Sequence, residues 1–188
     1  MSNNYFTNPL VFLIETAFFL YMILLALRLL MPWARWDYHH PISQFIVRFT
    51  QPPLNLLRSF IPAIGRLDTA TLVLLIIVTM IKLLLVSMLF GYLLGPMALI
   101  QRSIAEIFSL FITLFTVTIL IEVVLSWITP PGSHNPAANL IRRLNAPLLE
   151  PVRKKMPSTS GLDLTPLVVV IGLQLLHMLV LPLLLLGL

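Results

Sequence analysis

The chain has 188 residues, of which 59% are hydrophobic and 10% are charged, and its formal net charge is +5. Soluble domains carry roughly 25% charged residues, so these few charges cannot cover the surface of a water-soluble protein of this size. The chain contains no cysteine, which excludes disulfides, thiolate chemistry and cysteine-ligated metals. The composition therefore predicts an integral membrane protein.

Four apolar stretches are long enough to cross a bilayer core of about 30 Å, which takes about 20 helical residues. Backbone groups in lipid must be hydrogen-bonded within their own segment, so each stretch is predicted to be a helix. The first stretch is too long for a signal-peptide core, and we expect it to be retained. The predicted spans are Leu10–Met31, Thr71–Leu94, Ile104–Ile128 and Leu164–Leu188.

Each long loop between spans contains an amphipathic stretch, with apolar residues at positions i, i+3, i+4 and i+7. These residues are Ile42, Phe45, Ile46 and Phe49 in the first loop, and Ala137, Leu140, Ile141 and Leu144 in the second. Beside a membrane, such a helix is expected to lie in the interface with its basic face toward the headgroups. The alternative is a helix packed on the protein itself.

The polar side of the first stretch is predicted to contain Ser43, Gln44 and Arg48. We expect prolines to end both loop helices, because proline cannot continue a helix without losing a hydrogen bond. The relevant prolines are Pro52 and Pro53 in the first loop and Pro147 in the second.

A shift of 95 residues superimposes the second loop on the first without a gap. Six identities between residues 41–68 and 136–163 involve Pro, Arg or Asp, which hydrophobicity alone does not explain. They pair Pro41 with Pro136, Arg48 with Arg143, Pro52 with Pro147, Arg58 with Arg153, Pro62 with Pro157 and Asp68 with Asp163. The sequence predicts two tandem helix–loop–helix repeats, 1–95 and 96–188. Each has two spans, so both insert in the same orientation, unlike inverted-topology repeats.

Nine of the twelve Lys and Arg residues lie in the two long loops, whereas the opposite side offers only Arg102. The positive-inside rule then places both loops in the cytoplasm and both termini outside. We expect the basic residues to face anionic lipid headgroups, and we expect no nucleic-acid partner. They include Arg48, Arg58, Arg142, Arg143, Arg153, Lys154 and Lys155.

Two charges occupy equivalent positions near the cytoplasmic ends of the first and third spans. Arg28 lies five residues before Trp33, and Glu122 lies five before Trp127. A charge inside a bilayer costs at least about 2.5–3.5 kcal/mol, so each needs a partner or an exit to water. We predict that Arg28 and Glu122 pair across the two repeats. The alternative is that Arg28 extends independently to the interface.

A second polar site is predicted nearer the bilayer centre. Lys82 and His177 are equivalent under the 95-residue shift and lie about 16 Å deep by helical rise. Lys82 must find a carboxylate, lose its proton or face water, and Glu15 on the neighbouring helix is a candidate partner. These groups would either line a proton or ion pathway or form hydrogen bonds between packed helices.

No phosphate-binding loop, paired-carboxylate site or activated serine occurs in a suitable context. His39 and His40 lack companions spaced for a metal. We therefore predict no catalytic site, cofactor or metal. Asp68 and Asp163 each precede a predicted helix and are expected to cap its free N–H groups.

The loop motif resembles that of the YggT family of bacterial membrane proteins, which is related to the YlmG proteins. It reads TQPPLNLLRSFIPAIGRLD over residues 50–68, and NAPLLEPVRKKMP followed by GLD over residues 145–157 and 161–163. The second copy departs from the pattern at Asn145, which replaces a threonine, and at its shifted glycine. The resemblance covers nearly the whole chain. It implies an inner-membrane protein with an assembly or scaffolding role, since plastid relatives are associated with cytochrome haem assembly.

The leading prediction is a non-enzymatic inner-membrane protein that assists assembly or organisation of other membrane components, acting with a membrane-protein partner or as a homo-oligomer. The alternative is a small oligomeric transporter or channel subunit. In that case Lys82, His177, Glu15 and the pair of Arg28 and Glu122 would line a polar path through the bilayer.

Overall fold

The computed structural model describes residues 4–59, 61, 68–128, 136–156 and 163–186. Within these ranges the structure is entirely helical, and a long, a short and a long helix follow one another twice. The first set is α1 (Asn4–Leu30), α2 (Pro41–Arg58) and α3 (Thr69–Leu89), and the second is α4 (Pro96–Ile128), α5 (Pro136–Arg153) and α6 (Thr165–Leu185). The four long helices are apolar and long enough to cross a membrane, which confirms the predicted number of spans.

Helix α4 is longer than predicted. It has 33 residues and begins at Pro96, eight residues before the predicted start at Ile104. Proline suits the first turn of a helix, because its fixed φ is already helical and its missing N–H would have no partner there. Gln101 and Arg102 reduce the apolar character of these first turns, but neither residue opposes helix formation.

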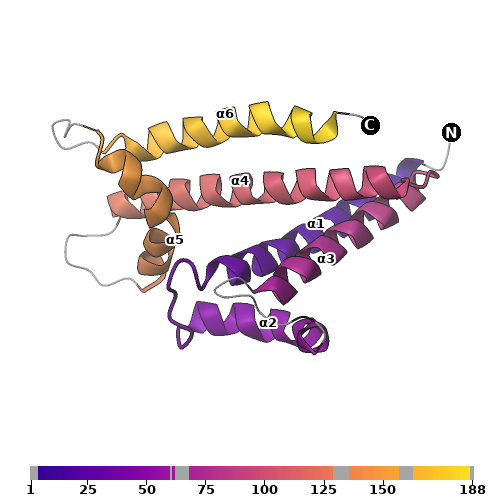
Figure 1. The fold of residues 1–188 in the computed structure, drawn as a ribbon, viewed down its shortest axis with the longest axis horizontal. Coiled ribbons are helices and arrows are strands. Elements are labelled where there is room, and N and C mark those ends of the chain that lie inside the picture. Colours follow the sequence, from indigo (N-terminus) through magenta and orange to yellow (C-terminus); the bar gives the residue numbers. More distant parts are fainter. Residues whose placement is uncertain (1–3, 60, 62–67, 129–135, 157–162, 187–188) are drawn as a thin grey trace.

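The long helices form two hairpins, in which α1 packs against α3 and α4 packs against α6. Figure 1 shows that α1 and α4 run in the same direction, and that α2 and α5 both lie at the end where α1 and α4 finish. The hairpins meet near the opposite end and diverge toward α2 and α5. Contacts between the hairpins come mainly from α3 against α4.

Three clusters of buried side chains hold the helices together. The first joins α1, α3 and α4 around Met22, Leu75 and Leu110. The second joins the chain after α1 to α2 and α5, and the third joins α4, α5 and α6. Because lipid is as apolar as these side chains, close packing and hydrogen bonds hold such helices together rather than removal of apolar surface from water.

The prediction that prolines end the loop helices is wrong. Helix α2 continues through Pro52 and Pro53 to Arg58, and α5 continues through Pro147 and Pro151 to Arg153. A proline inside a helix removes one backbone hydrogen bond and clashes with the preceding turn, which can bend the helix without ending it. Figure 1 shows α2 changing direction along its length, so that its second part is seen end-on.

The predicted apolar face of α2 is divided between two environments. Ile46 is buried against the protein, whereas Phe45 and Phe49 are 51% and 53% exposed. Ser43, which was predicted on the polar side, is buried and its hydroxyl has no hydrogen-bond partner. In α5 the equivalents of the two phenylalanines, Leu140 and Leu144, are buried. The alternative of packing on the protein itself therefore describes α5 better than α2.

Candidate functional site

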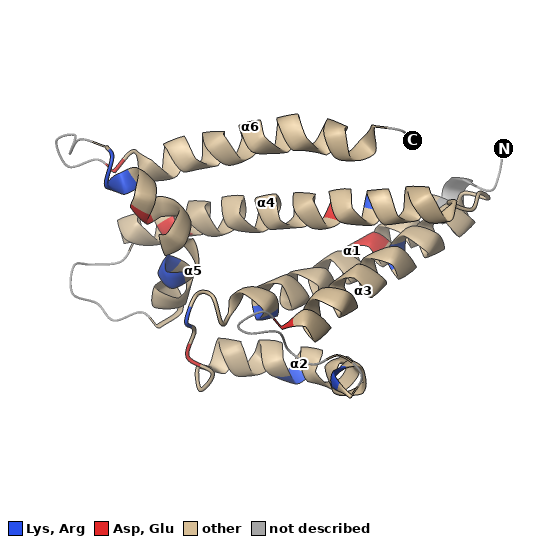
Figure 2. Cartoon of the chain, in the orientation of Figure 1, with Lys and Arg blue, Asp and Glu red and all other residues tan. Residues whose placement is uncertain are grey.

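Charged side chains are concentrated on α2, α5 and the segments beside them, and only a few lie on the long helices (Figure 2). Those few fall at two depths. The first level lies close to α2 and α5 and contains Arg28 and Glu122. The second lies toward the other end of the bundle and contains Glu15, Lys82, Arg102 and Glu106, together with His177.

At the first level, Arg28 of α1 is held by α2. Its side chain is 8% exposed and donates hydrogen bonds to the backbone oxygen of Val47 at 3.2 Å, to Oγ1 of Thr50 at 2.8 Å and to Oε1 of Gln51 at 2.6 Å. All three acceptors are neutral. Because Thr50 Oγ1 also lies 2.6 Å from the oxygen of Ile46, the hydroxyl both donates to α2 and accepts from Arg28.

Glu122 of α4 occupies the corresponding position in the second half of the chain and is held by α5. Its Oε2 accepts a hydrogen bond of 2.8 Å from Nδ2 of Asn145. The Oδ1 of Asn145 in turn accepts one of 2.8 Å from Thr118, also on α4. Asn145 is fully buried. One amide therefore ties the loop helix to two turns of α4.

The predicted pair between Arg28 and Glu122 is not formed in the structure. Each side chain bonds to the short helix that follows its own long helix instead. The physical reason is the divergence of the two hairpins toward the end where α2 and α5 lie (Figure 1). The long helices are spread apart at the level of these two charges, and each charge is within reach of a short helix instead.

At the second level, Lys82 of α3 forms an ion pair with Glu106 of α4, which joins the two hairpins. The side chains are 10% and 26% exposed. The predicted carboxylate, Glu15 of α1, is exposed and forms no ion pair with Lys82 in the part of the chain that the structure describes. The sequence left three outcomes open for Lys82: a carboxylate partner, loss of its proton or contact with water. The structure places a carboxylate of the other hairpin beside it.

His177 lies apart from Lys82, on the other side of α4. Its Nε2 is 2.9 Å from Oγ of Ser109, and its ring stacks against Phe108 with a centroid distance of 6.1 Å. The predicted site of Lys82, His177 and Glu15 is therefore divided by α4 into two contacts. Ser109 comes 94 residues after Glu15, which is also the separation between Arg28 and Glu122.

Two equivalent ion pairs join the ends of the short helices to the starts of the long helices that follow. Arg58 contacts Asp68 at 2.6 Å, and Arg153 contacts Asp163 at 2.7 Å. Asp68 also accepts from the N–H of Thr71, which confirms its capping role. Burial alone would raise the pKa of Asp68, but the hydrogen bonds from Thr71 and Arg58 outweigh it and hold the pKa below its ordinary value.

Asp163 behaves in the same way. It accepts from the N–H of Thr165 at 3.0 Å, within the first turn of α6. Slight burial would raise the pKa of its carboxyl, but the hydrogen bonds from Thr165 and Arg153 lower it. The carboxylate is therefore the form that stabilises this helix start.

All seven basic residues predicted to face headgroups are exposed. Arg58 and Arg153 are engaged in the ion pairs above, and Arg143 donates to the backbone oxygen of Arg35 at 3.1 Å. Next to that contact, Nε1 of Trp36 donates to the oxygen of Leu140 at 2.9 Å. These two bonds attach α5 to the segment that follows α1, and so connect the two halves.

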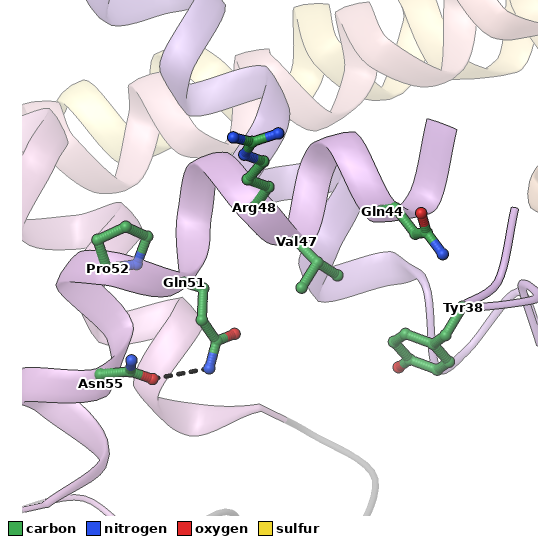
Figure 3. A pocket seen from close by; sticks show the side chains of 7 residues that line it. All are labelled: Tyr38, Gln44, Val47, Arg48, Gln51, Pro52 and Asn55. Carbon is green, nitrogen blue, oxygen red and sulfur yellow. Dashed lines mark hydrogen bonds between the residues drawn. The ribbon is translucent and has the colours of Figure 1, made fainter. Parts of the chain in front are cut away.

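A shallow hollow of about 680 Å³ lies along α2 and includes Tyr38, Gln44 and Arg48. Figure 3 shows Gln51 and Asn55 side by side in it, joined by a hydrogen bond of 2.7 Å. Gln51 also accepts from the buried Arg28, so it connects the membrane-embedded charge to the surface of α2. Among the residues that the structure describes, no group of three His, Asp or Glu side chains is placed to hold a metal.

Comparison with known proteins identifies the family. The profile of the family described as CCB3/YggT matches residues 7–89 and 101–184. The chain belongs to this family. The resemblance inferred from the loop motif is thereby confirmed.

Relatives of the chain match it over most of its length. An uncharacterised protein of Pseudomonas aeruginosa is 42% identical over 172 residues, which are 90% of this chain and 87% of that protein. The uncharacterised protein YggT of Escherichia coli K12 is 33% identical over 171 residues, covering 91% and 88%. An uncharacterised protein encoded in the proC 3′ region of Vibrio alginolyticus is 32% identical over 177 residues, covering 89% and 90%. No solved structure matches.

For this CCB3/YggT family member, sequence reasoning missed the neutral partners of the charges. In the sequence, Asn145 of the second loop motif was noted only as a replacement of the threonine found at position 50 in the first. The structure shows that both contact the charged residue on the preceding long helix. A comparison of the two halves would have supplied a signal, because the charge and its neutral partner change together.

Chemically, the polar residues at these two levels form hydrogen bonds and an ion pair that join neighbouring helices. These polar groups are largely satisfied by one another: Lys82 by Glu106, Glu122 by Asn145, and Arg28 by three acceptors on α2. Such contacts hold membrane helices in register, since an unsatisfied polar group in hydrocarbon costs several kcal/mol.

Proposed function

We propose that this family member is a non-enzymatic protein of the inner membrane that assists the assembly or organisation of other membrane components. It would consist of two parallel repeats, with α2 and α5 at the cytoplasmic face and both termini outside. The matching order of helices, the two 18-residue short helices and the equivalent ion pairs at Asp68 and Asp163 support the repeat. The excess of basic residues around α2 and α5 supports the orientation.

The observation that carries the proposal is the difference between α3 and α6. Helix α3 packs against α1, α2 and α4, whereas α6 packs against α4 and α5. Helix α6 buries only Thr165 and Val169. Helix α3 buries Ala70, Thr71, Leu74, Leu75, Val78, Thr79, Lys82 and Ser87. In equivalent positions of two repeats, one helix has an intramolecular neighbour that the other lacks. We infer that α6 receives a transmembrane helix of another component, or of a second copy.

The short helices add a second surface for organisation. The exposed apolar residues Phe45 and Phe49 of α2 lie on a different side from Arg48 and Gln44. A helix with this division suits the interface, where apolar groups enter the acyl region and basic groups remain among the headgroups. Anionic lipids and cytoplasmic proteins are the partners whose charge complements this face.

The proposal is tested by photocrosslinking in the native membrane. A photoreactive residue at Met178 of α6, which is 70% exposed, should give a discrete protein adduct. Ile77 of α3, which is 38% exposed, is the control on the helix that already has three neighbours, and it should give only lipid adducts. Deletion of the gene should then lower the amount of the assembled partner complex without changing partner synthesis. Identical lipid adducts at both positions, with partner assembly unchanged, would contradict the proposal.

One observation favours the alternative of an oligomeric transporter or channel subunit. Glu15, Lys82 and Glu106 place three ionisable groups at the second level of the membrane-spanning region. Charges inside membrane segments often mark proton or ion pathways. Purified protein in vesicles should then conduct protons or cations, and Lys82→Ala should abolish the flux. Flux that is absent, or equal in the variant, would argue for the assembly role.

A further inference from the structure

A groove between the two halves of the protein is lined entirely by apolar atoms. It has a volume of about 410 Å³ and lies where the α1–α3 hairpin diverges from the α4–α6 hairpin. One wall includes Ile23 and Leu27 of α1, and the other includes Leu114 and Val117 of α4. Phe19 and Val117 are 40% and 46% exposed, so the groove opens sideways from the bundle.

The end of the groove nearest α5 is closed by a connection between the halves. Trp36 and Leu140 line this end and are joined by the hydrogen bond from the indole to the Leu140 oxygen. Directly beside it, Arg143 donates to the oxygen of Arg35. The side chains of Arg35 and Arg143 are both exposed, and neither is paired with a carboxylate within the described ranges.

We propose that this groove binds one anionic phospholipid, with an acyl chain between α1 and α4 and the headgroup phosphate at Arg35 and Arg143. The lining contains no polar atom that could hold water or a polar ligand. The volume falls in the range of small-molecule sites, about 300–1,000 Å³. A guanidinium with one N–H engaged retains four donors for phosphate oxygens.

A helix from a second copy fits the groove less well than a lipid chain. A helix is about 10 Å wide and rises about 5.4 Å per turn, so a groove of about 410 Å³ holds roughly one turn. A spanning helix would need several turns. A flexible acyl chain can follow the narrow space. The bound lipid would fill the space between hairpins that contact each other mainly through α3 and α4.

The tryptophans of the chain provide a direct test. Trp36 lines the groove and is 7% exposed, whereas Trp127 at the end of α4 is 79% exposed and lies outside the groove. Substitution of the other two tryptophans by phenylalanine leaves one reporter in each protein. Each protein is reconstituted in phosphatidylcholine vesicles containing increasing amounts of phosphatidylglycerol with brominated acyl chains. Bromine quenches only those indoles that its chain reaches.

We expect Trp36 to reach half-maximal quenching at an about tenfold lower mole fraction of brominated phosphatidylglycerol than Trp127, as expected for about one charge-assisted contact. Brominated phosphatidylcholine should remove this difference. In the Trp36 reporter, Val117→Phe should fill the groove and reduce quenching. Val168→Phe, on the exposed face of α6, is the control and should leave quenching unchanged.

Substitution of the two arginines tests the headgroup contact separately from the binding of the acyl chain. Arg35→Gln with Arg143→Gln should abolish the preference for phosphatidylglycerol while brominated chains still quench Trp36. All variants are compared as monodisperse protein with the wild-type helical circular dichroism spectrum. If Trp36 and Trp127 were half-quenched at the same mole fraction of brominated phosphatidylglycerol, in proteins without the groove or arginine substitutions, the proposal would be overturned. An unquenched Trp36 would also overturn it, because it would mean that protein fills the groove.

Discussion

Asn145 donates a hydrogen bond of 2.8 Å to the carboxylate of Glu122, at the position where Thr50 accepts one of 2.8 Å from Arg28 in the first half of the chain. The charge and its neutral partner have both changed between the halves, and the direction of the hydrogen bond has changed with them. An amide N–H suits a carboxylate acceptor, and a hydroxyl oxygen suits a guanidinium donor. The same attachment of a short helix to a long one is therefore made with opposite charges.

Thr50→Val should destabilise the protein by about 1–3 kcal/mol. Valine has nearly the size of threonine but no hydroxyl, so the buried guanidinium of Arg28 loses one hydrogen-bond acceptor. Thr113→Val, at an exposed position of α4, is the control and should change stability by less than about 0.5 kcal/mol. Thermal unfolding in a mild detergent measures both. Equal effects at the two positions would show that Thr50 does not hold Arg28.

Arg28→Leu and Glu122→Leu should have additive effects on stability, within about 0.5 kcal/mol, because the two charges bind different helices. Arg28→Leu and Thr50→Val should instead be strongly non-additive, since they remove the two partners of one hydrogen bond. Double-mutant cycles on unfolding free energies test both statements. A coupling between Arg28 and Glu122 larger than that between Arg28 and Thr50 would restore the pair predicted from the sequence.

Lys82→Met and Glu106→Gln should each lower stability more than the double substitution does. Each single change leaves one charge inside the membrane-spanning region without its partner. We expect about 2–4 kcal/mol for each single change, because Glu106 is only partly buried. Glu15→Gln should cost less than either, since Glu15 is exposed and makes no direct ion pair in the described part of the chain. Thermal unfolding of the four proteins decides the order.

The stability of the protein should fall at acid pH as the capping aspartates become protonated. The pKa of Asp68 is lower in the folded protein than its ordinary value. The carboxylate therefore contributes stability that is present above the unfolded-state pKa of about 3.9, and that is lost as the pH falls through the lower folded-state pKa. Asp68→Asn should lower stability at pH 7 by about 1 kcal/mol and weaken the acid decline. Glu150→Gln, at an exposed position of α5, is the control.

The orientation can be tested with single cysteines, because the chain contains none. Cysteine at Met97, at the start of α4, should react with an impermeant thiol reagent added outside intact spheroplasts. Cysteine at Lys154, after α5, should react only after lysis, whereas cysteine at Gly172 within α6 should stay unlabelled. Labelling of Lys154→Cys in intact cells would reverse the proposed topology.

The sequence by itself determined the helices, because each is indicated by a pattern within its own stretch of residues. Four apolar runs predict four spanning helices, because backbone groups in lipid can be satisfied only within each helix. The 95-residue shift pairs Arg58 with Arg153 and Asp68 with Asp163, and the structure contains an ion pair between Arg58 and Asp68 and another between Arg153 and Asp163. The periodicity of the loops indicated α2 and α5, although the prolines bend or interrupt bonding in these helices without ending them.

Only the tertiary structure decided which groups meet. Equivalent depth suggested that Arg28 contacts Glu122, and Glu15 was a candidate partner for Lys82 because it lies on the neighbouring helix. Neither depth nor the order of the helices specifies the angle between two hairpins. The hairpins converge near Lys82, which brings Glu106 within reach, and diverge near Arg28, where α2 provides the acceptors instead. The same divergence forms the apolar groove beside Trp36. The position of a residue in the sequence specifies its depth along a helix and the face on which it lies. The angle between helices depends on side-chain packing over the whole bundle.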